Sequence, residues 1–250
     1  MSRGGPREAF AAAKVNLFLH VGPRGADGYH PVASLMVFAD VGDRLTLDLA
    51  KPAQALRIEG PFAAGLSAGD DNLVVRAREA LAPGEPIGLV LDKQLPLSSG
   101  LGGGSADAAA ALRLVNARRA SPLPAQRLAE IARTLGADVA ACLIGRPALA
   151  AGRGDQLAPA PPLPPLHAVL VNPGAECPTA EVYGLFDASG ARAAADMPVL
   201  PEAFANAEAV AALVSATRND LEAPAVGLRP AIAAALAALR IEPETLVSRM

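Results

Sequence analysis

A run of glycines and serines near the middle of the chain has the composition of a phosphate-binding loop. Glycines let successive backbone N–H groups point into one concavity, and a helix that begins directly after them adds partial positive charge. Together these features make a cradle for phosphate groups. The side chains of Ser99 and Ser105 could add hydroxyl ligands for phosphate or for Mg²⁺. The run is Leu95-Pro96-Leu97-Ser98-Ser99-Gly100-Leu101-Gly102-Gly103-Gly104-Ser105-Ala106-Asp107.

The spacing of this loop excludes other nucleotide-binding motifs. A P-loop requires Lys and then Ser or Thr after its last glycine, whereas Ser105-Ala106 follows here. A dinucleotide fingerprint that starts at Gly100 would place its third glycine at Ser105. The catalytic-loop and magnesium-binding motifs of protein kinases are also absent from the sequence. An ordinary flexible loop, with Ser105 as the cap of the next helix, stays open as the alternative.

The segments around the loop predict strand, loop and helix in that order. A strand is expected at 87–91, leading through Lys93 into the loop, and a helix at 105–116. Further helices are expected at 73–81, capped by Asp71 or Asn72, at 125–135, ended by a left-handed Gly136, and from Asp138 onward. Upstream strands are expected at 13–21, where apolar residues alternate, and at 32–38 and 44–49.

A proline-rich stretch at 157–165 is the predicted linker between two domains, 1–156 and 166–250, because so many prolines fit neither a helix nor a central strand. Beyond it, the pattern predicts a strand at 168–171 and helices at 181–186, 202–216 and 230–239.

Composition narrows the class of protein. The 250 residues are 52% apolar, carry a net charge of −3 with the two signs interspersed, and include no Trp, which argues against nucleic-acid binding. No apolar run reaches the roughly 20 residues that span a bilayer, and the N-terminus does not have the pattern of a secretory leader. The two cysteines, Cys142 and Cys177, have neither metal-ligand nor disulfide spacing, so we expect a cytoplasmic protein with no metal site built from protein ligands. We expect the protein to be a monomer or a homodimer.

The motifs taken together resemble those of the GHMP kinase superfamily. The loop from Pro96 to Asp107 resembles its second signature, which cradles the ATP phosphates in that family. Residues 13–19 and the tetrapeptide at 27–30 resemble the first signature of the branch whose substrate is a cytidine diphosphate-linked methylerythritol. Further matches follow in the family's order over nearly the whole chain: Asp71-Asn72-Leu73, Gly136-Ala137-Asp138-Val139, Gly152-Arg153-Gly154-Asp155 and Asn219-Asp220-Leu221.

This resemblance implies an α+β fold of two domains, an N-terminal ATP-binding domain that is ribosomal protein S5 domain 2-like and a ferredoxin-like C-terminal domain. It also implies ATP- and Mg²⁺-dependent phosphorylation of the 2-hydroxyl of the methylerythritol unit, in the non-mevalonate route to isoprenoid precursors. The alternatives are a GHMP kinase for another small alcohol, such as homoserine, mevalonate or a sugar, and a nucleotide-binding protein of this fold with little or no kinase activity.

The resemblance assigns roles to single residues. Asp138 matches the family's base and Lys14 its partner, and phosphoryl transfer needs such a carboxylate and ammonium beside the reacting groups. Tyr29 and His30 match residues that hold the cytosine, with Tyr183 as the opposite aromatic. Asn16 is expected to bind the same substrate. The predicted ATP-binding residues are Asn72, Lys93, Pro96, Leu97, Ser98, Ser99, Gly100, Leu101, Gly102, Gly103, Gly104, Ser105 and Ala106.

Two features depart from the family pattern. Ala140 stands where family members often carry Pro after the Asp-Val pair. Ser248-Arg249-Met250 resembles the approach to the third family signature, a Ser/Gly-rich loop that does not follow in this sequence. We therefore expect the sequence to be part of a longer protein, and a form extended by that loop to be more stable and more active.

Overall fold

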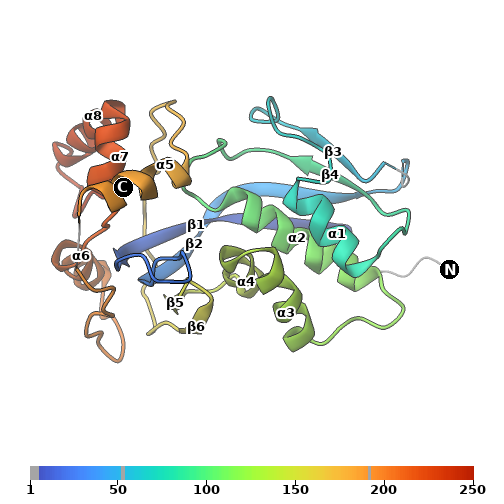
Figure 1. Ribbon diagram of the computed structural model, residues 1–250, viewed down its shortest axis with the longest axis horizontal. Coiled ribbons are helices and arrows are strands. Elements are labelled where there is room, and N and C mark those ends of the chain that lie inside the picture. Colours follow the sequence, from blue (N-terminus) through green and yellow to red (C-terminus); the bar gives the residue numbers. More distant parts are fainter. Residues whose placement is uncertain (1–5, 52–53, 191–192) are drawn as a thin grey trace. The chain divides into compact units, whose positions relative to one another are not determined.

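The computed structural model describes residues 6–51, 54–190 and 193–250 (Figure 1). Its mixture of strands and helices confirms the predicted α+β class. The strands are β1 (Glu8–Val21), β2 (Val32–Asp48), β3 (Leu56–Glu59), β4 (Gly88–Asp92), β5 (Ala148–Ala151) and β6 (Gln156–Pro159). The helices are α1 (Leu73–Leu81), α2 (Gly103–Arg118), α3 (Ala125–Leu135), α4 (Ala137–Ile144), α5 (Thr179–Ala188), α6 (Ala207–Ala216), α7 (Glu222–Leu228) and α8 (Pro230–Arg240).

The chain divides into two compact units. Unit 1 contains the residues up to Val15 and Phe38–Arg146, and unit 2 contains Asn16–Val37 and Pro147–Met250. The long strands β1 and β2, which pair with each other, therefore contribute residues to both units. The domain boundaries predicted from the proline-rich stretch, 1–156 and 166–250, remain a prediction.

In unit 1, the C-terminal half of β2 pairs antiparallel with β4, from Arg44 opposite Asp92 to Asp48 opposite Gly88. Strand β3 pairs parallel with the other side of β4. Helix α2 contacts α1, α3 and α4, and Figure 1 shows α1 and α2 side by side. Its run of alanines from 108 to 111 is fully buried, because small side chains let neighbouring elements approach closely.

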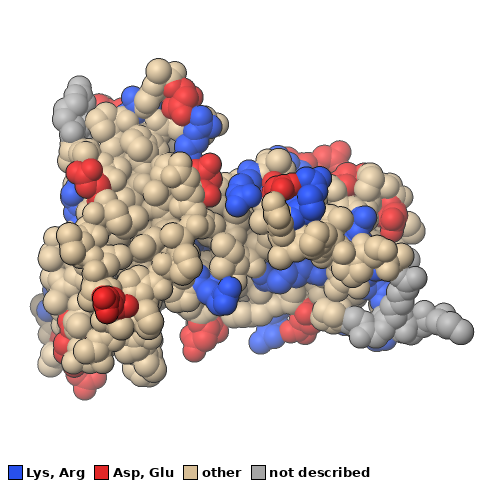
Figure 2. Space-filling view, turned by 90° about the horizontal axis from the view of Figure 1, so that it is seen from below, with Lys and Arg blue, Asp and Glu red and all other residues tan. Residues whose placement is uncertain are grey.

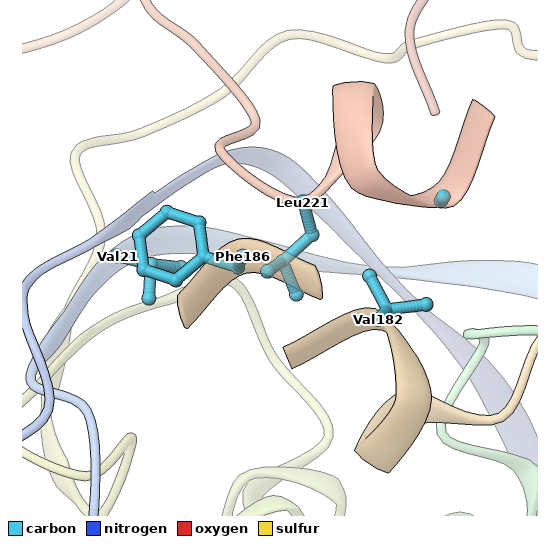
Figure 3. Close-up of a cluster of buried hydrophobic side chains, with 5 residues drawn as sticks. Val21, Val182, Phe186 and Leu221 are labelled. Atoms are coloured by element: carbon cyan, nitrogen blue, oxygen red, sulfur yellow. The ribbon is translucent and has the colours of Figure 1, made fainter. Parts of the chain in front are cut away.

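In unit 2, the N-terminal half of β2 pairs antiparallel with β5, which pairs with β6. A hydrophobic cluster joins Val21 of β1 to Val182 and Phe186 of α5 and to Leu221 at the start of α7 (Figure 3). Sequence positions separated by about 200 residues thus share one core. The cluster holds α5 against β1, and α5 carries three of the residues discussed below.

Several predicted elements differ from the structure. The two strands expected at 32–38 and 44–49 are one strand, β2, and Gly42 inside it marks the close approach of the Ala11 backbone rather than a break. Gly136 has φ 163°, which is extended backbone, so the left-handed cap predicted there is wrong. The strand predicted at 168–171 is also wrong: these residues form no strand and are exposed, with Val169 75% exposed, and a strand needs a pairing partner.

The surface carries charges of both signs. Lys and Arg side chains and Asp and Glu side chains are scattered among uncharged residues on the face displayed in Figure 2, as the interspersed charges of the sequence predict. No single described helix has the length and apolar character needed to cross a membrane. Only α7 and α8 taken together, bent by 119° at their junction, match by length and composition.

Candidate active site

The glycine loop between β4 and α2 has an alternating backbone handedness. Ser98 (φ 51°), Gly100 (φ 76°) and Gly102 (φ 65°) all adopt positive φ, and Ser98 is the one described non-glycine residue of the chain that does so. Alternation of left-handed and ordinary residues turns successive N–H groups toward one concavity, which binds anions. A serine in this conformation costs free energy and is typical of a functional site.

Helix α2 begins directly at the end of this concavity. Its N-cap is Gly102, and no described side chain caps its first turn. The N–H groups of that turn, with the partial positive charge of the helix, are therefore available to an anion. Ser105 lies within the first turn rather than at the cap, so the alternative in which Ser105 serves as the helix cap is wrong.

Lys14 and Asp138 lie together in unit 1. Lys14 Nζ is 3.3 Å from Asp138 Oδ2, and the side chains are 6% and 43% exposed, respectively. Lys14 comes from β1, where its backbone N–H donates to Leu101 O at 2.8 Å, and Asp138 lies in the first turn of α4. The pair thus places a carboxylate open to solvent and a buried ammonium beside the glycine loop.

Lys93 lies beneath the loop and is buried, with its ammonium bonded to the carboxylates of Asp43 and Asp107. Burial raises the pKa of Asp107 to about 8, because a carboxylate loses hydration there, while the neighbouring Lys93 ammonium opposes this effect. The structure therefore gives Lys93 two aspartate side chains as partners inside the protein. Its contact with a nucleotide stays a prediction.

The predicted substrate residues of unit 2 form a ring cluster around His30. The His30 and Tyr183 ring centroids are 4.9 Å apart, and Phe186 meets His30 edge-on at 5.8 Å. His30 Nε2 donates to Asp187 Oδ1 at 2.7 Å. Tyr183, Phe186 and Asp187 all lie on α5, so one helix fixes the plane and the hydrogen bonding of the imidazole.

Tyr29 is held from one side by an arginine. The Arg153 guanidinium lies 4.2 Å from the centroid of the Tyr29 ring, which is 57% exposed, and it pairs with Asp27 Oδ2 at 2.6 Å. The Tyr29 N–H and the Arg153 side chain lower the pKa of Asp27 by hydrogen bonding to its carboxylate. With Arg153 on one face, Tyr29 has a preferred orientation even though it lies on the surface.

Two predicted binding residues have partners inside the protein. Asn72 caps α1, since its Oδ1 accepts from the Val74 N–H at 2.9 Å, and its Nδ2 donates to Ser67 O. Asn16 Oδ1 accepts from the Ser34 hydroxyl at 3.2 Å in unit 2. The predicted contacts of Asn16 and Asn72 with ligands remain predictions.

Sequence reasoning missed the residues that support the site from a distance. Asp43, Asp187 and Arg153 were not among the predicted site residues, although Arg153 belongs to a matched motif. Asp43 bonds a lysine 50 positions away and Asp187 a histidine 157 positions away, so no local spacing could reveal them.

A family model described as the GHMP kinases N terminal domain matches residues 72–146, which contain α1, the glycine loop and Asp138. A relative from Caulobacter vibrioides, "4-diphosphocytidyl-2-C-methyl-D-erythritol kinase", is 54% identical over 248 residues, 97% of this chain and 85% of the relative. The chain belongs to the 4-diphosphocytidyl-2-C-methyl-D-erythritol kinase family. A relative of the same name from Hyphomonas neptunium is 46% identical, with 96% and 82% of the two chains covered.

Solved structures agree with membership of this kinase family. A crystal structure of 4-(cytidine 5'-diphospho)-2C-methyl-D-erythritol kinase matches with a TM-score of 0.70 and 35% identity, covering 93% of this chain and 82% of that one. A homoserine kinase from Cytophaga hutchinsonii, 19% identical with a TM-score of 0.56 over 96% and 80% of the two chains, shares the fold. The GHMP resemblance is confirmed, and the protein is an ATP-dependent kinase with a small-molecule substrate.

Proposed function

We propose that the protein transfers the γ-phosphoryl group of ATP to the 2-hydroxyl of 4-diphosphocytidyl-2-C-methyl-D-erythritol, in the cytoplasm. The names of relatives up to 54% identical support this substrate. The single structural observation that carries the proposal is the Lys14–Asp138 pair beside an anion-binding glycine loop.

In this proposal, Asp138 accepts the proton of the substrate hydroxyl as its oxygen attacks the γ-phosphorus. The bond between that phosphorus and the β–γ bridging oxygen breaks, and ADP leaves with the electron pair. Lys14 orients the carboxylate and offsets negative charge near the transferred group. The N–H groups of the glycine loop and of the first turn of α2 hold the phosphates in place.

Mg²⁺ is proposed to enter with the nucleotide. Among the described residues, no group of three or more His, Cys, Asp or Glu side chains could hold a metal ion. Protein sites for Mg²⁺ usually supply one or two groups and leave the rest to phosphates and water. The hydroxyls of Ser99 and Ser105 suit such a role. When bound, Mg²⁺ neutralises charge on the β- and γ-phosphates.

The ring cluster of unit 2 is proposed to hold the cytosine. Because His30 Nε2 donates to Asp187, the neutral imidazole presents Nδ1 as an acceptor. The amino group of cytosine is a donor, so the two are complementary. Tyr29 and Tyr183 supply aromatic faces for stacking. This arrangement favours a cytidine-linked acceptor over homoserine or mevalonate, which have no base.

The test is a transfer assay with γ-labelled ATP and three acceptors at equal concentration. We expect label to move to 4-diphosphocytidyl-2-C-methyl-D-erythritol and not to homoserine or mevalonate. Equal transfer to all three would contradict the proposed substrate. The variants Tyr29→Ala and His30→Ala give a second test. If they remain active but no longer prefer the cytidine-linked acceptor over the other two, this result would support the proposed placement of the cytosine.

A further inference from the structure

Asp43, Lys93 and Asp107 form a buried ionic cluster, which we call the loop anchor. Their side chains are 0%, 3% and 2% exposed, so none of them faces solvent. We propose that Asp43 is a positioning residue that holds the glycine loop in its anion-binding conformation, with Lys93 linking it to helix α2. This inference rests on the proposed function only in taking the glycine loop as the ATP phosphate site.

Asp43 holds the beginning of the loop through its backbone. Its Oδ1 accepts the N–H of Gln94 at 2.6 Å and the N–H of Leu95 at 2.7 Å, and its Oδ2 accepts from the Lys93 ammonium. Three consecutive residues, at the point where β4 becomes the loop, therefore bond to one carboxylate. Charge-assisted hydrogen bonds of this kind are short and strong, particularly where water is excluded.

Lys93 connects the two ends of the loop. Its Nζ donates to Asp107 Oδ2 at 3.0 Å, and Asp107 lies in the second turn of α2. A Cβ built on Gly103 would lie 2.9 Å from the Lys93 Nζ, so the backbone at the end of the loop packs directly against the ammonium. The loop thus leaves β4 bonded to Asp43 and enters α2 over Lys93.

The middle of the loop is tied to β1. The Lys14 N–H donates to Leu101 O at 2.8 Å, and a Cβ on Gly102 would lie 3.2 Å from Lys14 Cε. Lys14 and the loop anchor together hold the stretch where positive φ alternates. Since Ser98 adopts an unfavourable φ of 51° in this stretch, the surroundings must maintain that conformation.

The two carboxylates of the loop anchor have different environments. Asp43 receives donors on both oxygens, whereas Asp107 Oδ1 is buried with no hydrogen-bond partner among the described atoms. Burial raises the pKa of Asp107 to about 8, which favours the neutral form of this carboxyl. With Asp107 neutral, Asp43 and Lys93 form a charge-balanced pair, and no excess negative charge lies beneath a loop that binds phosphates.

Two double variants separate the anchoring role from a merely structural one. Asp43→Ala with Lys93→Met removes both charges and the acceptor for the Gln94 and Leu95 N–H groups, and leaves no unpaired buried charge. Asp43→Asn with Lys93→Gln also removes both charges but keeps an amide oxygen as that acceptor. Asp48→Asn is the matched control, because Asp48 Oδ1 likewise accepts two backbone N–H groups, of Ala50 and Lys51, at the C-terminal end of β2.

The measurement is the dissociation constant of a non-hydrolysable ATP analogue, with KM for ATP and for the acceptor. For Asp43→Ala/Lys93→Met, we expect the constant and the KM for ATP to rise by about tenfold or more, with the acceptor KM little changed. Because both double variants lack the Lys93 ammonium, the comparison between them isolates the acceptor: Asp43→Asn/Lys93→Gln should bind the analogue at least about threefold more tightly than Asp43→Ala/Lys93→Met. Asp48→Asn should match the parent. Equal affinity of the two double variants would overturn the proposal.

Amide hydrogen exchange of the unaltered protein gives a second test that needs no variant. The N–H groups of Gln94 and Leu95 should exchange as slowly as those of the core strands, without nucleotide. Fast exchange at both positions would overturn the anchoring role whether or not the double variants fold.

The binding measurements distinguish failure of the anchor from failure of the proposed function. If the unaltered protein fails to bind the ATP analogue, the proposed phosphate site is wrong. If it binds and the Ala/Met variant binds equally, the anchor alone is wrong.

Discussion

The Lys14 ammonium lies 3.3 Å from the carboxylate of Asp138, and the lysine is almost fully buried while the aspartate is 43% exposed. This difference in exposure separates the two roles. A base must reach an incoming hydroxyl, whereas an ammonium that orients the base is more effective where water is excluded. The backbone N–H of Lys14 also bonds to Leu101, so one residue of β1 positions both the base and the glycine loop.

Asp138→Asn should remove the base and leave the nucleotide site intact. We expect kcat to fall by about a hundred- to ten-thousand-fold, because an amide cannot accept the proton of the hydroxyl. The dissociation constant of the ATP analogue should stay within about threefold. Glu208→Gln, in the first turn of α6, is the control for a lost acidic side chain at a helix start. A loss of activity under tenfold would make Asp138 a structural residue of α4.

Asp187→Asn should weaken binding of the cytidine-linked acceptor alone. An amide at this position no longer fixes which ring nitrogen of His30 carries the hydrogen, so the acceptor at Nδ1 is lost in part of the molecules. We expect the acceptor KM to rise by about tenfold, as for the loss of a hydrogen bond to a charged group, while the KM for ATP stays unchanged.

Glu181→Gln is the control for Asp187→Asn, because it removes a carboxylate from the same helix, α5. Steady-state kinetics with each substrate varied in turn would measure both effects. Equal increases in the two KM values, or an unchanged acceptor KM, would count against a role for Asp187 in orienting His30.

The parts of the site that the sequence predicts are those carried by local motifs. The composition of the glycine loop suffices to predict an anion cradle after a strand and before a helix, and the structure has β4, the loop and α2 in that order. Lys14 and Asp138 were expected only through the order of motifs along the chain, because singly each matches an ordinary strand or helix residue.

Features that depend on long-range packing were not predictable. Nothing near Asp43 indicates that it will meet Lys93, since the pairing depends on the antiparallel register of β2 and β4. In the same way, a short apolar run predicted a strand at 168–171, but a strand forms only where another segment offers hydrogen bonds. The prolines of 157–165 resemble a linker in composition, yet 157–159 lie in β6, paired with β5.

Cys142 should be inert in the folded protein. Burial raises the pKa of its thiol to about 12, and the thiolate is the reactive form. Cys177 is less buried, so treatment with iodoacetamide at pH 8 should label Cys177 and leave Cys142 unlabelled until the protein is unfolded in urea. Mass spectrometry of the peptides would distinguish the two sites. Labelling of Cys142 as fast as Cys177 in the native protein would contradict the packing of α4 against α2.

Asp107 should make the stability of the protein fall as the pH rises toward 8. Its folded pKa of about 8 lies above the ordinary value of 3.8, so between these two values the folded state holds a proton that the unfolded state has lost. The free energy of unfolding therefore decreases with pH over this window and levels off above about pH 8. The charged or titratable groups that face Asp107 are Lys93, Asp43 and Cys142.

Asp107→Asn isolates this contribution, because an amide has the shape of the neutral carboxyl and does not titrate. Urea unfolding of both proteins from pH 5 to pH 9 would give the difference in unfolding free energy at each pH. We expect the unaltered protein to lose stability relative to the variant up to about pH 8, and the two curves to run parallel above that value. Parallel curves over the whole range would show that Asp107 is already ionised at pH 5, and with it the charge balance inferred for the loop anchor would fail.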